Sequence, residues 1–283
     1  MRVAFLGPEG TFSHEALESH PPPPSVRDVE QVPLPTVYDV VMAVHHREVE
    51  RALVPVENSV EGGVNATLDA LAMETEDVAI VGEVVHPIRH CLIAREPIEL
   101  ERIEAVVSHP QPNAQCARFL RARLAGVPVL AASSTAEAVR MVAEARDRPL
   151  AALGTRLAAE LYGCEVLRSG VEDAADNETR FVWLAPAGTD PGEHGPWKTS
   201  IVFWGVGSEA PGWLVRCLSE FAFRGVNLTK IESRPRKQGL GRSMFFADLE
   251  GRAADAHVAE AITGLRAHAE RVRVIGSYPF GAA

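Results

Sequence analysis

The sequence predicts an α/β protein built from two units, and three observations carry this prediction. Over residues 1–185, short apolar runs alternate with polar turns and amphipathic segments, which is typical of parallel sheets covered by helices on both faces. Residues 186–196 (Pro-Ala-Gly-Thr-Asp-Pro-Gly-Glu-His-Gly-Pro) have the composition of a linker. Residues 197–283 then follow the order strand-helix-strand-strand-helix-strand, which is the ferredoxin-like pattern.

Composition agrees with two domains and excludes several classes of protein. The chain has 283 residues, 46% of them hydrophobic and 23% charged, as in ordinary globular proteins. A net charge of −10 and the lack of a Lys/Arg run argue against a nucleic-acid partner. No targeting signal is evident, and no apolar run approaches the roughly 20 residues that a membrane helix needs. The four cysteines form no CxxC pair, so we expect reduced thiols in a cytoplasmic protein.

The elements of the first unit follow from apolar runs and from the residues that can start helices. Helices are expected to begin near Thr11, Thr36, Asn65, Ser108, Ser133 and Thr155. Strands are expected at residues 3–6, 32–34, 52–54, 78–85, 88–94, 103–107, 127–131, 150–153 and 164–167, with a further strand entered at 182–184. The strand at 52–54 ends in a polar loop with two glycines (55–63), where open α/β sheets place ligands.

Hydroxyl side chains recur where these helices begin. They are Thr11 and Ser13, Ser59, Ser108, residues 133–135, and Thr155. The first N–H groups of a helix lack intrahelical partners and can bind anions, although each hydroxyl could also be an ordinary helix cap. Several such starts facing one crevice would bind a substrate with more than one carboxylate.

The stretch Asp176-Asn-Glu-Thr-Arg-Phe-Val-Trp-Leu184 places Thr179 and Arg180 where a loop becomes a strand. A hydroxyl and a guanidinium at such a point can be held rigidly while facing a cleft, as in many sites for anionic small molecules. The alternative is a strand edge with two solvated polar residues. His86 and His90 are four residues apart, but Pro87 and the strand pattern keep them off a helix, so no metal site is predicted.

The second unit is expected to contain strands at residues 199–206, 228–234, 243–250 and 272–278, and helices at 212–223 and 254–269. Two stretches in it could bind a ligand, one at 211–215 and one at 226–235, although both could also be ordinary turns. Gly205-Val-Gly207 is a GxG fragment without its third glycine, so no nucleotide cofactor is predicted.

Taken together, the motifs resemble those of the prephenate dehydratases, and they occur in the same order along nearly the whole chain. They are Gly7-Pro-Glu-Gly-Thr-Phe-Ser13, Val54-Pro-Val-Glu-Asn-Ser59, His90-Cys-Leu92, Ser108-His-Pro-Gln111 with Gln115-Cys116, and Asp176-Asn-Glu-Thr-Arg-Phe181. Residues 197–283 resemble an ACT regulatory domain with its Glu232-Ser-Arg-Pro235 signature.

The resemblance implies a catalytic domain (1–185) with two lobes, like a type II periplasmic binding protein, and a substrate between them. It implies decarboxylating dehydration of prephenate to phenylpyruvate in phenylalanine biosynthesis, without a cofactor. Thr179 would be the essential residue. Asn58, Ser108 and Gln115 match positions for substrate binding or catalysis, and the expected lining residues are Thr11, Ser59, Arg180 and Phe181.

For the ACT domain the resemblance implies feedback control by L-phenylalanine and a homo-oligomer, commonly a tetramer built as a dimer of dimers. The expected effector-binding residues are Gly212, Trp213, Leu214, Val215, Asn227, Glu232, Ser233, Arg234 and Pro235. Trp213 departs from the usual Gly-Ala-Leu-Val motif, and we expect its indole to reshape the effector pocket.

Two other functions remain open at this stage. One is arogenate dehydratase, whose substrate carries an amine in place of the keto group. The other is a non-catalytic amino-acid sensor, which would not need the hydroxyl donor of Thr179. No chorismate mutase helix precedes Met1, so a monofunctional enzyme is expected.

Overall fold

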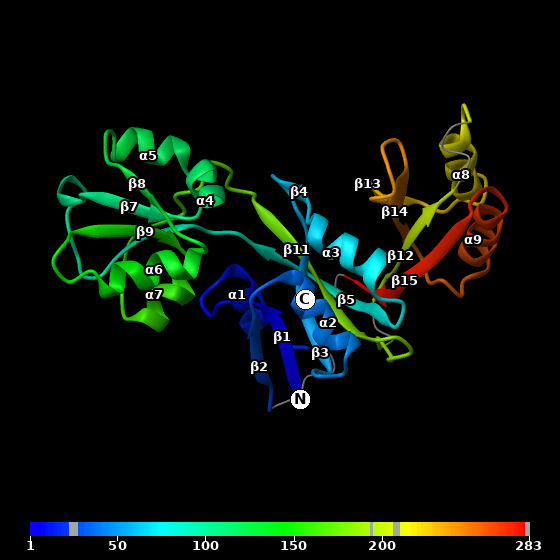
Figure 1. The fold of residues 1–283 in the computed structure, drawn as a ribbon, viewed down its shortest axis with the longest axis horizontal. Coiled ribbons are helices and arrows are strands. Elements are labelled where there is room, and N and C mark those ends of the chain that lie inside the picture. The colour runs from blue at the N-terminus through cyan, green and yellow to red at the C-terminus, as the bar shows by residue number, and fades with distance from the viewer. Residues whose placement is uncertain (23–27, 193–194, 206–209, 281–283) are drawn as a thin grey trace.

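The computed structural model describes residues 1–22, 28–192, 195–205 and 210–280. The chain forms three bodies in a row: a first lobe in the middle, a second lobe on one side, and a C-terminal unit on the other (Figure 1). We call residues 1–87 with 178–186 the first lobe, residues 91–169 the second lobe, and residues 197–280 the C-terminal unit. The chain crosses between the lobes twice, at 87–91 and at 169–178.

The first lobe has a sheet in the order β5-β11-β3-β1-β2, flanked by helices. Its strands are β1 (Arg2–Leu6), β2 (Glu30–Leu34), β3 (Arg51–Asn58), the short β4 (Gly62–Gly63) beside β3, β5 (Val78–Pro87) and β11 (Glu178–Pro186). Its helices are α1 (Phe12–Ser19), α2 (Val37–His45) and α3 (Asn65–Asp69), with a π-helical turn at Ala70–Glu74. Strand β3 continues through the predicted loop as far as Asn58, because β11 pairs with it there.

The second lobe has a five-stranded sheet in the order β10-β6-β9-β7-β8. Its strands are β6 (Cys91–Ala94), β7 (Ala105–Ser108), β8 (Val129–Ala131), β9 (Leu150–Gly154) and β10 (Glu165–Ser169). Its helices are α4 (Pro110–Gln115), α5 (Ala117–Arg123), α6 (Thr135–Glu144) and α7 (Arg156–Tyr162), with a 3-10 turn at Leu100–Arg102. The helix expected to reach Leu124 is interrupted at Cys116, whose backbone leaves the helical region (φ −112°, ψ 17°).

The expectation of purely parallel sheets is wrong in both lobes. Strand β1 runs parallel to β2 and β3, but β11 is antiparallel to β3 and β5. In the second lobe β7 is parallel to β8 and β9, whereas β6 is antiparallel to β9 and β10. The antiparallel strands β6 and β11 are those that adjoin the two crossings between the lobes, where no helix reverses the chain direction.

The C-terminal unit contains β12 (Trp197–Trp204), α8 (Trp213–Ala222), β13 (Leu228–Pro235), β14 (Ser243–Glu250), α9 (Ala256–His268) and β15 (Arg271–Pro279). Its antiparallel strand order, β13-β14-β12-β15, confirms the ferredoxin-like prediction. Two residues of the GxG fragment, Val206 and Gly207, lie outside the described residues.

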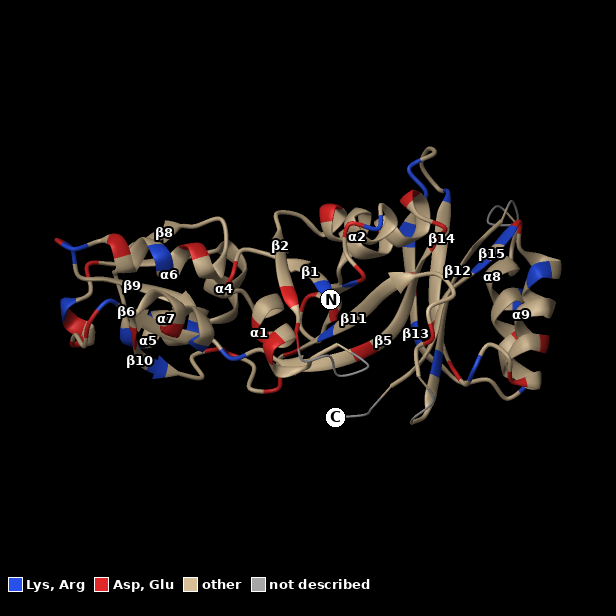
Figure 2. Cartoon of the chain, turned by 90° about the horizontal axis from the view of Figure 1, so that it is seen from below, with Lys and Arg blue, Asp and Glu red and all other residues tan. Residues whose placement is uncertain are grey.

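The C-terminal sheet is buried on both faces. Helices α8 and α9 cover one face around Phe203, Phe221 and Ala247. On the other face, Met244, Phe246 and Tyr278 share a core cluster with the first lobe, including Val54 and Leu71. Figure 2 shows the C-terminal strands beside β5 and β11, away from the second lobe.

The sheet of the first lobe and the sheet of the C-terminal unit join at a single residue pair, Gly276 of β15 and Ile80 of β5. The ten strands of these two parts therefore form one sheet. A Cβ atom at Gly276 would lie 2.5 Å from the carbonyl oxygen of Ile80 and 2.6 Å from its Cβ. The strands can approach this closely only because residue 276 has no side chain.

We expect Gly276→Ala to lower the free energy of unfolding by about 1–3 kcal/mol, because the strands must move apart. Chemical denaturation measures this. Gly82→Ala in β5 is the matched control, since its Cβ would make an ordinary 3.5 Å contact with Trp183. Equal effects of the two substitutions would contradict the steric explanation.

Candidate active site

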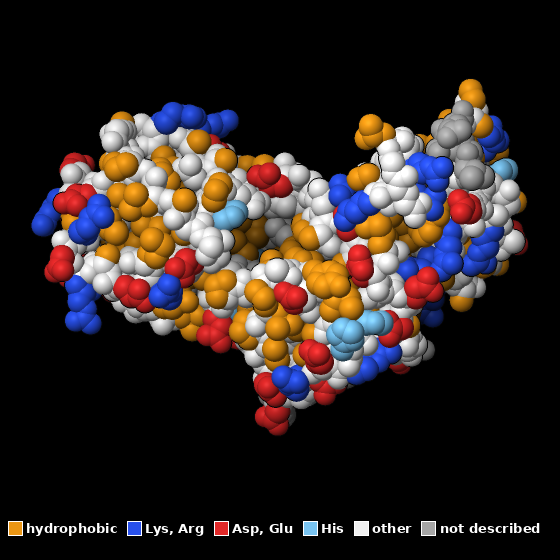
Figure 3. Space-filling view, in the orientation of Figure 1, with side chains coloured by type: hydrophobic (Ala, Val, Ile, Leu, Met, Phe, Trp, Pro, Cys, Tyr) orange, Lys and Arg blue, Asp and Glu red, His pale blue; other side chains and the backbone are white. Residues whose placement is uncertain are grey.

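A cavity of about 390 Å³ lies between the two lobes. The first lobe, the crossings and the second lobe all contribute to its wall, and Figure 3 shows the surface hollowed there. It is lined by Leu6, Gly7, Thr11, Phe12, Ser13, Pro35, Pro55, Asn58, Val64, Ile88, His90, His109, Gln111, Pro112, Gln115, Ser133, Ser134, Thr135, Thr179 and Phe181. Thus the structure brings together five of the predicted site residues: Thr11, Asn58, Gln115, Thr179 and Phe181.

Thr179 and Asn58 form the centre of the site. They are directly opposite each other on the antiparallel strands β11 and β3. The side-chain amide of Asn58 donates to Thr179 Oγ1 at 2.9 Å, and its own carbonyl accepts from the backbone N–H groups of Val60 and Glu61. Because an amide nitrogen can only donate, the Thr179 oxygen accepts and its own proton stays available. No described residue takes that proton, so it can be donated to a molecule in the pocket.

A chain of hydrogen-bonded amides continues from Asn58 to the second lobe. Asn58 also donates to Asn177 Oδ1 (2.8 Å), and Asn177 donates to Gln115 Oε1 (3.2 Å). The same Gln115 oxygen lies 2.9 Å from His90 Nε2. Sequence reasoning did not assign Asn177 or His90 to the site, although both belong to the motifs quoted above. Their positions within those motifs were the only available signal.

His90 is held neutral in this chain. Its side chain is buried, and burial lowers the pKa of His90 below its ordinary value of 6.5, outweighing the hydrogen bond to Gln115 and the nearby Glu172. Since the Gln115 oxygen accepts, the proton of the neutral imidazole lies on Nε2.

Two of the helix starts that line the cavity, one from each lobe, are capped by hydroxyl side chains. Thr11 caps α1 and Ser134 caps α6, each accepting from the backbone N–H three residues on. Within the described residues, the backbone N–H groups of Phe12, Ser13 and Thr135 have no hydrogen-bond acceptor, and all three residues line the cavity. No Lys or Arg does so in the described part of the chain. Helix N-termini therefore supply the positive potential for an anion.

The remaining predicted hydroxyls do not line the cavity. Ser59 is exposed and accepts from the backbone N–H of Glu178, so it fastens the loop after β3 to the start of β11. Ser108 is buried at the end of β7 and donates to the His109 carbonyl. Thr155 caps α7 and donates to the Gly10 carbonyl, which ties the second lobe to the first.

Arg180 corrects a prediction. Its side chain leaves β11 on the face opposite Thr179 and contacts three carboxylates, Glu57 (3.2 Å), Glu83 (3.0 Å) and Asp248 (2.7 Å). Burial opposes its charge, but Asp248 and Glu83 raise the pKa of Arg180, so the guanidinium stays protonated. Arg180 therefore does not line the cavity, because neighbouring side chains of a strand point to opposite faces.

Comparison with known proteins agrees with this arrangement of the cavity and its residues. A family model described as prephenate dehydratase matches residues 3–189. The chain belongs to the prephenate dehydratase family.

Curated relatives in this family include two kinds of dehydratase. The chain is 40% identical to a bifunctional chorismate mutase/prephenate dehydratase of Aquifex aeolicus, over 99% of this chain and 74% of that one. It is 37% identical to the prephenate dehydratase of Mycobacteroides abscessus (99% and 90% covered). It is also 37% identical to arogenate dehydratase 2 of Petunia hybrida (99% and 72% covered).

Solved structures show the same fold. The crystal structure of the prephenate dehydratase of Arthrobacter aurescens in complex with L-Phe has a TM-score of 0.88 at 36% identity, covering 99% of this chain and 90% of that one. The structure described as GqqA, a quorum-quenching acylase, has a TM-score of 0.86 at 29% identity, covering 99% and 98%. The fold thus occurs with more than one described activity, so the reaction must be argued from the site.

The predicted effector residues occupy two surfaces of the C-terminal unit. Val215, Asn227, Ser233 and Pro235 are exposed, as is Gly212 at the start of α8. Leu214 packs partly on the core, whereas Glu232 and Arg234 face the first lobe, where Arg234 pairs with Asp69 at 3.3 Å.

The side chain of Trp213 points into the core of the C-terminal unit. It packs against Phe203 and Phe245, and its indole N–H donates to the His268 carbonyl at 2.7 Å. The residue is 5% exposed, so its indole belongs to the core of the unit, and its effect on an effector pocket stays a prediction.

Within the described residues, no group of three His, Cys, Asp or Glu side chains could hold a metal ion. His86 lies 3.3 Å from Glu15, while His90 contacts Gln115, so the two imidazoles have different partners. None of the described helices is both long and apolar enough to span a membrane.

The lowered pKa of His90 predicts a pH effect on stability. Near and below pH 6.5 His90 takes up a proton in the unfolded state but stays neutral in the folded state. The free energy of unfolding of the wild type therefore falls as the pH falls. His90→Gln lacks this titration. The difference in free energy of unfolding between wild type and variant should therefore shrink between about pH 7.5 and 5.5. Denaturation curves at each pH measure it, and parallel pH profiles would contradict a neutral buried His90.

Proposed function

We propose that this protein converts prephenate to phenylpyruvate, CO2 and water, in phenylalanine biosynthesis. One observation carries the proposal: the Thr179 hydroxyl, oriented by Asn58, has a free proton in a cavity between two lobes. A non-catalytic sensor would not need a donor held in this way.

The driving force lies in the substrate. Prephenate carries a carboxylate and a hydroxyl on opposite ring carbons. When the ring carboxylate leaves as CO2, its bonding electrons enter the ring and the hydroxyl leaves as hydroxide, which makes the ring aromatic. The hydroxide takes up a proton from solvent and becomes water. No electron sink is needed. The protein has to supply a donor to the departing oxygen and a site for the anionic groups.

Thr179 supplies the donor. An alcohol is too weak an acid to give up its proton outright, so its role is a hydrogen bond that strengthens as negative charge develops on the leaving oxygen. The amide of Asn58 donates to Thr179 Oγ1 and polarises the hydroxyl in the same direction.

The helix starts bind the pyruvyl carboxylate. The free N–H groups of α1 and α6 can hold the pyruvyl carboxylate without a full positive charge. The absence of Lys and Arg from the described lining also favours the reaction, because a cation on the ring carboxylate would stabilise the ground state and oppose loss of CO2.

The same site could act on arogenate, and relatives described as arogenate dehydratases are also 37% identical. The two substrates differ by an amine in place of a keto group. Comparing kcat/KM for prephenate and arogenate decides between them.

The proposal extends to regulation and assembly. We assign catalysis to residues 1–185, a linker to 186–196 and an ACT regulatory domain to 197–283. L-Phenylalanine would bind this domain near Gly212 to Val215 and Asn227 to Pro235, as supported by the L-Phe complex of the Arthrobacter relative. The edge strand β13 carries the exposed Ile231 and suits pairing of two ACT domains, in a homo-oligomer of cytoplasmic chains built as a dimer of dimers.

Thr179→Ala should lower kcat for prephenate by at least about a hundredfold with little change in KM, because the donor acts mainly in the transition state. Steady-state assays of phenylpyruvate formation measure this. Thr179→Ser is the control, since it keeps the hydroxyl and should keep most of the activity. An unchanged kcat in the alanine variant would remove Thr179 from the chemistry.

Isothermal titration should show L-phenylalanine binding to the full chain, and the same ligand should inhibit turnover. L-Alanine, which lacks the aromatic ring, should bind far more weakly. Absence of heat with L-phenylalanine would reject the effector site while leaving the catalytic proposal standing.

A further inference from the structure

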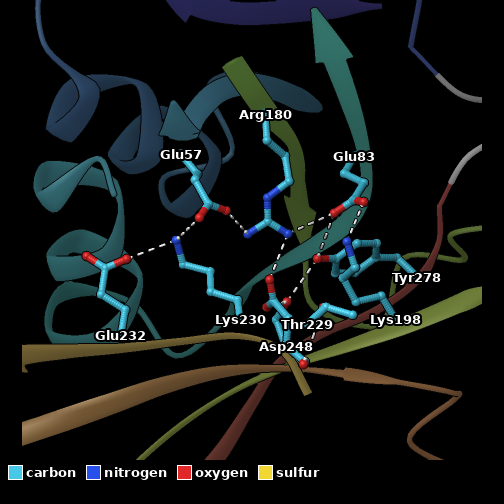
Figure 4. Close-up of polar contacts among 10 residues, drawn as sticks. Glu57, Glu83, Arg180, Lys198, Thr229, Lys230, Glu232, Asp248 and Tyr278 are labelled. Carbon is cyan, nitrogen blue, oxygen red and sulfur yellow. Dashed lines mark hydrogen bonds and ion pairs between the residues drawn. The ribbon is translucent and has the colours of Figure 1, made fainter. Parts of the chain in front are cut away.

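The contact between the first lobe and the C-terminal unit contains a cluster of partly and fully buried charges, which we call the ionic junction (Figure 4). The first lobe contributes Glu57, Glu83 and Arg180; the C-terminal unit contributes Lys198, Lys230, Glu232 and Asp248. Arg180 lies at the centre, and its shortest contact, 2.7 Å, is with Asp248 of the C-terminal unit.

Two members of the junction are chain neighbours of the two central active-site residues. Thr179 pairs with Asn58 across β11 and β3, and the next pair along the same strands is Arg180 with Glu57. Because side chains alternate between the faces of a sheet, Thr179 and Asn58 face the cavity while Arg180 and Glu57 face the C-terminal unit. Arg180 and Thr179 are adjacent in β11, and Glu57 and Asn58 are adjacent in β3. A shift of the Arg180–Glu57 pair therefore also moves the Thr179–Asn58 pair through the backbone that they share.

Asp248 is held firmly from its own side. Ser200 donates to Asp248 Oδ1 at 2.6 Å, and the Ser200 hydroxyl also contacts that of Tyr278 at 2.9 Å. Burial, with Asp248 and Glu83 nearby, raises the pKa of Tyr278, so its hydroxyl stays neutral. Ser200, Asp248 and Tyr278 come from three neighbouring strands, β12, β14 and β15, and so form a rigid platform.

Glu57 is linked to β13, the strand that carries the predicted effector signature, through Lys230. Lys230 lies 3.0 Å from Glu57 and 2.9 Å from Glu232, the first residue of the predicted effector signature. The carboxylate of Glu232 also lies directly against Gly63 of β4, which leaves no room for a side chain there. A ligand that displaces β13 would therefore act on Glu57, beside Asn58.

We propose that Asp248 is a positioning residue: through Arg180 it fixes β11 so that Thr179 and Asn58 keep their reactive geometry. Lys230 acts on Glu57 in the same way. Through these two contacts the ionic junction connects the C-terminal unit to the active site. This inference rests on the proposed function. It assigns Arg180, the expected substrate ligand, to the opposite face of the sheet and to a different task.

The test is Asp248→Asn in the full chain. The substitution keeps the shape of the side chain and the oxygen that accepts from Ser200, but it removes the negative charge that holds Arg180. We expect the C-terminal unit to remain folded. We expect kcat for prephenate to fall at least about tenfold with KM within about twofold, because small displacements of reacting groups are costly in rate. Inhibition by L-phenylalanine should weaken in the same variant.

Glu76→Gln is the matched control. It removes the exposed Glu76–Arg271 pair (2.5 Å), which joins the same two units next to Val78, at the opposite end of β11 from Thr179, and it should keep wild-type kcat. Arg180→Lys supplies a second variant, since a lysine keeps the charge but lacks the planar fork of five N–H donors with which Arg180 contacts Glu57, Glu83 and Asp248. Combining it with Asp248→Asn should lower kcat by less than the product of the single effects.

Each outcome decides something. A lower unfolding temperature with wild-type kcat in folded Asp248→Asn would reduce the junction to a structural contact and overturn the inference. An equal loss of kcat in Glu76→Gln would do the same. A wild-type chain inert toward both prephenate and arogenate would overturn the proposed function and the inference together.

Discussion

The antiparallel pairing of β3 with β11 is the contact on which the rest of this structure depends. It sets Asn58 opposite Thr179, and the next pair sets Glu57 opposite Arg180. One pair of strands thus presents a hydrogen-bonded, uncharged face to the cavity and a charged face to the C-terminal unit. A register irregularity follows, so that Phe181 pairs with Pro55 and both also line the cavity. Bulges of this kind often re-aim side chains next to active sites.

The cavity depends on both lobes at once. The hydroxyl donor comes from the first lobe, and the chain of amides from Asn58 through Asn177 ends on Gln115 and His90. Thr155 joins α7 of the second lobe to Gly10 beside α1. These buried polar contacts are satisfied only when the lobes are close, so they favour the arrangement in which the two helix starts face each other.

Much of this could be predicted from the sequence, because local signals were strong. Thr11, Thr36 and Thr155 cap helices as expected, and the ferredoxin-like order followed from the apolar pattern. Asn58 and Thr179 were identified by their motifs.

Two residues show where that reasoning ended. Arg180 was expected in the cavity because it stands with Thr179 in one motif at the entry to a strand. The face of a strand depends on its partners, which a local pattern does not reveal. Trp213 lies inside the core because α8 turns its first residue toward Phe203 and Phe245. Asn177 could not be singled out, since its role exists only when residues 58 and 115 meet.

The contact at Gly276 between the sheets of the first lobe and the C-terminal unit has a consequence for the solubility of each part. Strand β5 is interior only because β15 lies beside it, and the first lobe's apolar surface near Val54 and Leu71 is covered by Met244 and Phe246. A catalytic portion released from its C-terminal partner would present a bare strand edge and an uncovered hydrophobic face, both of which promote aggregation. Deletion of the C-terminal unit would therefore lower the solubility of the remaining chain, whatever it did to activity.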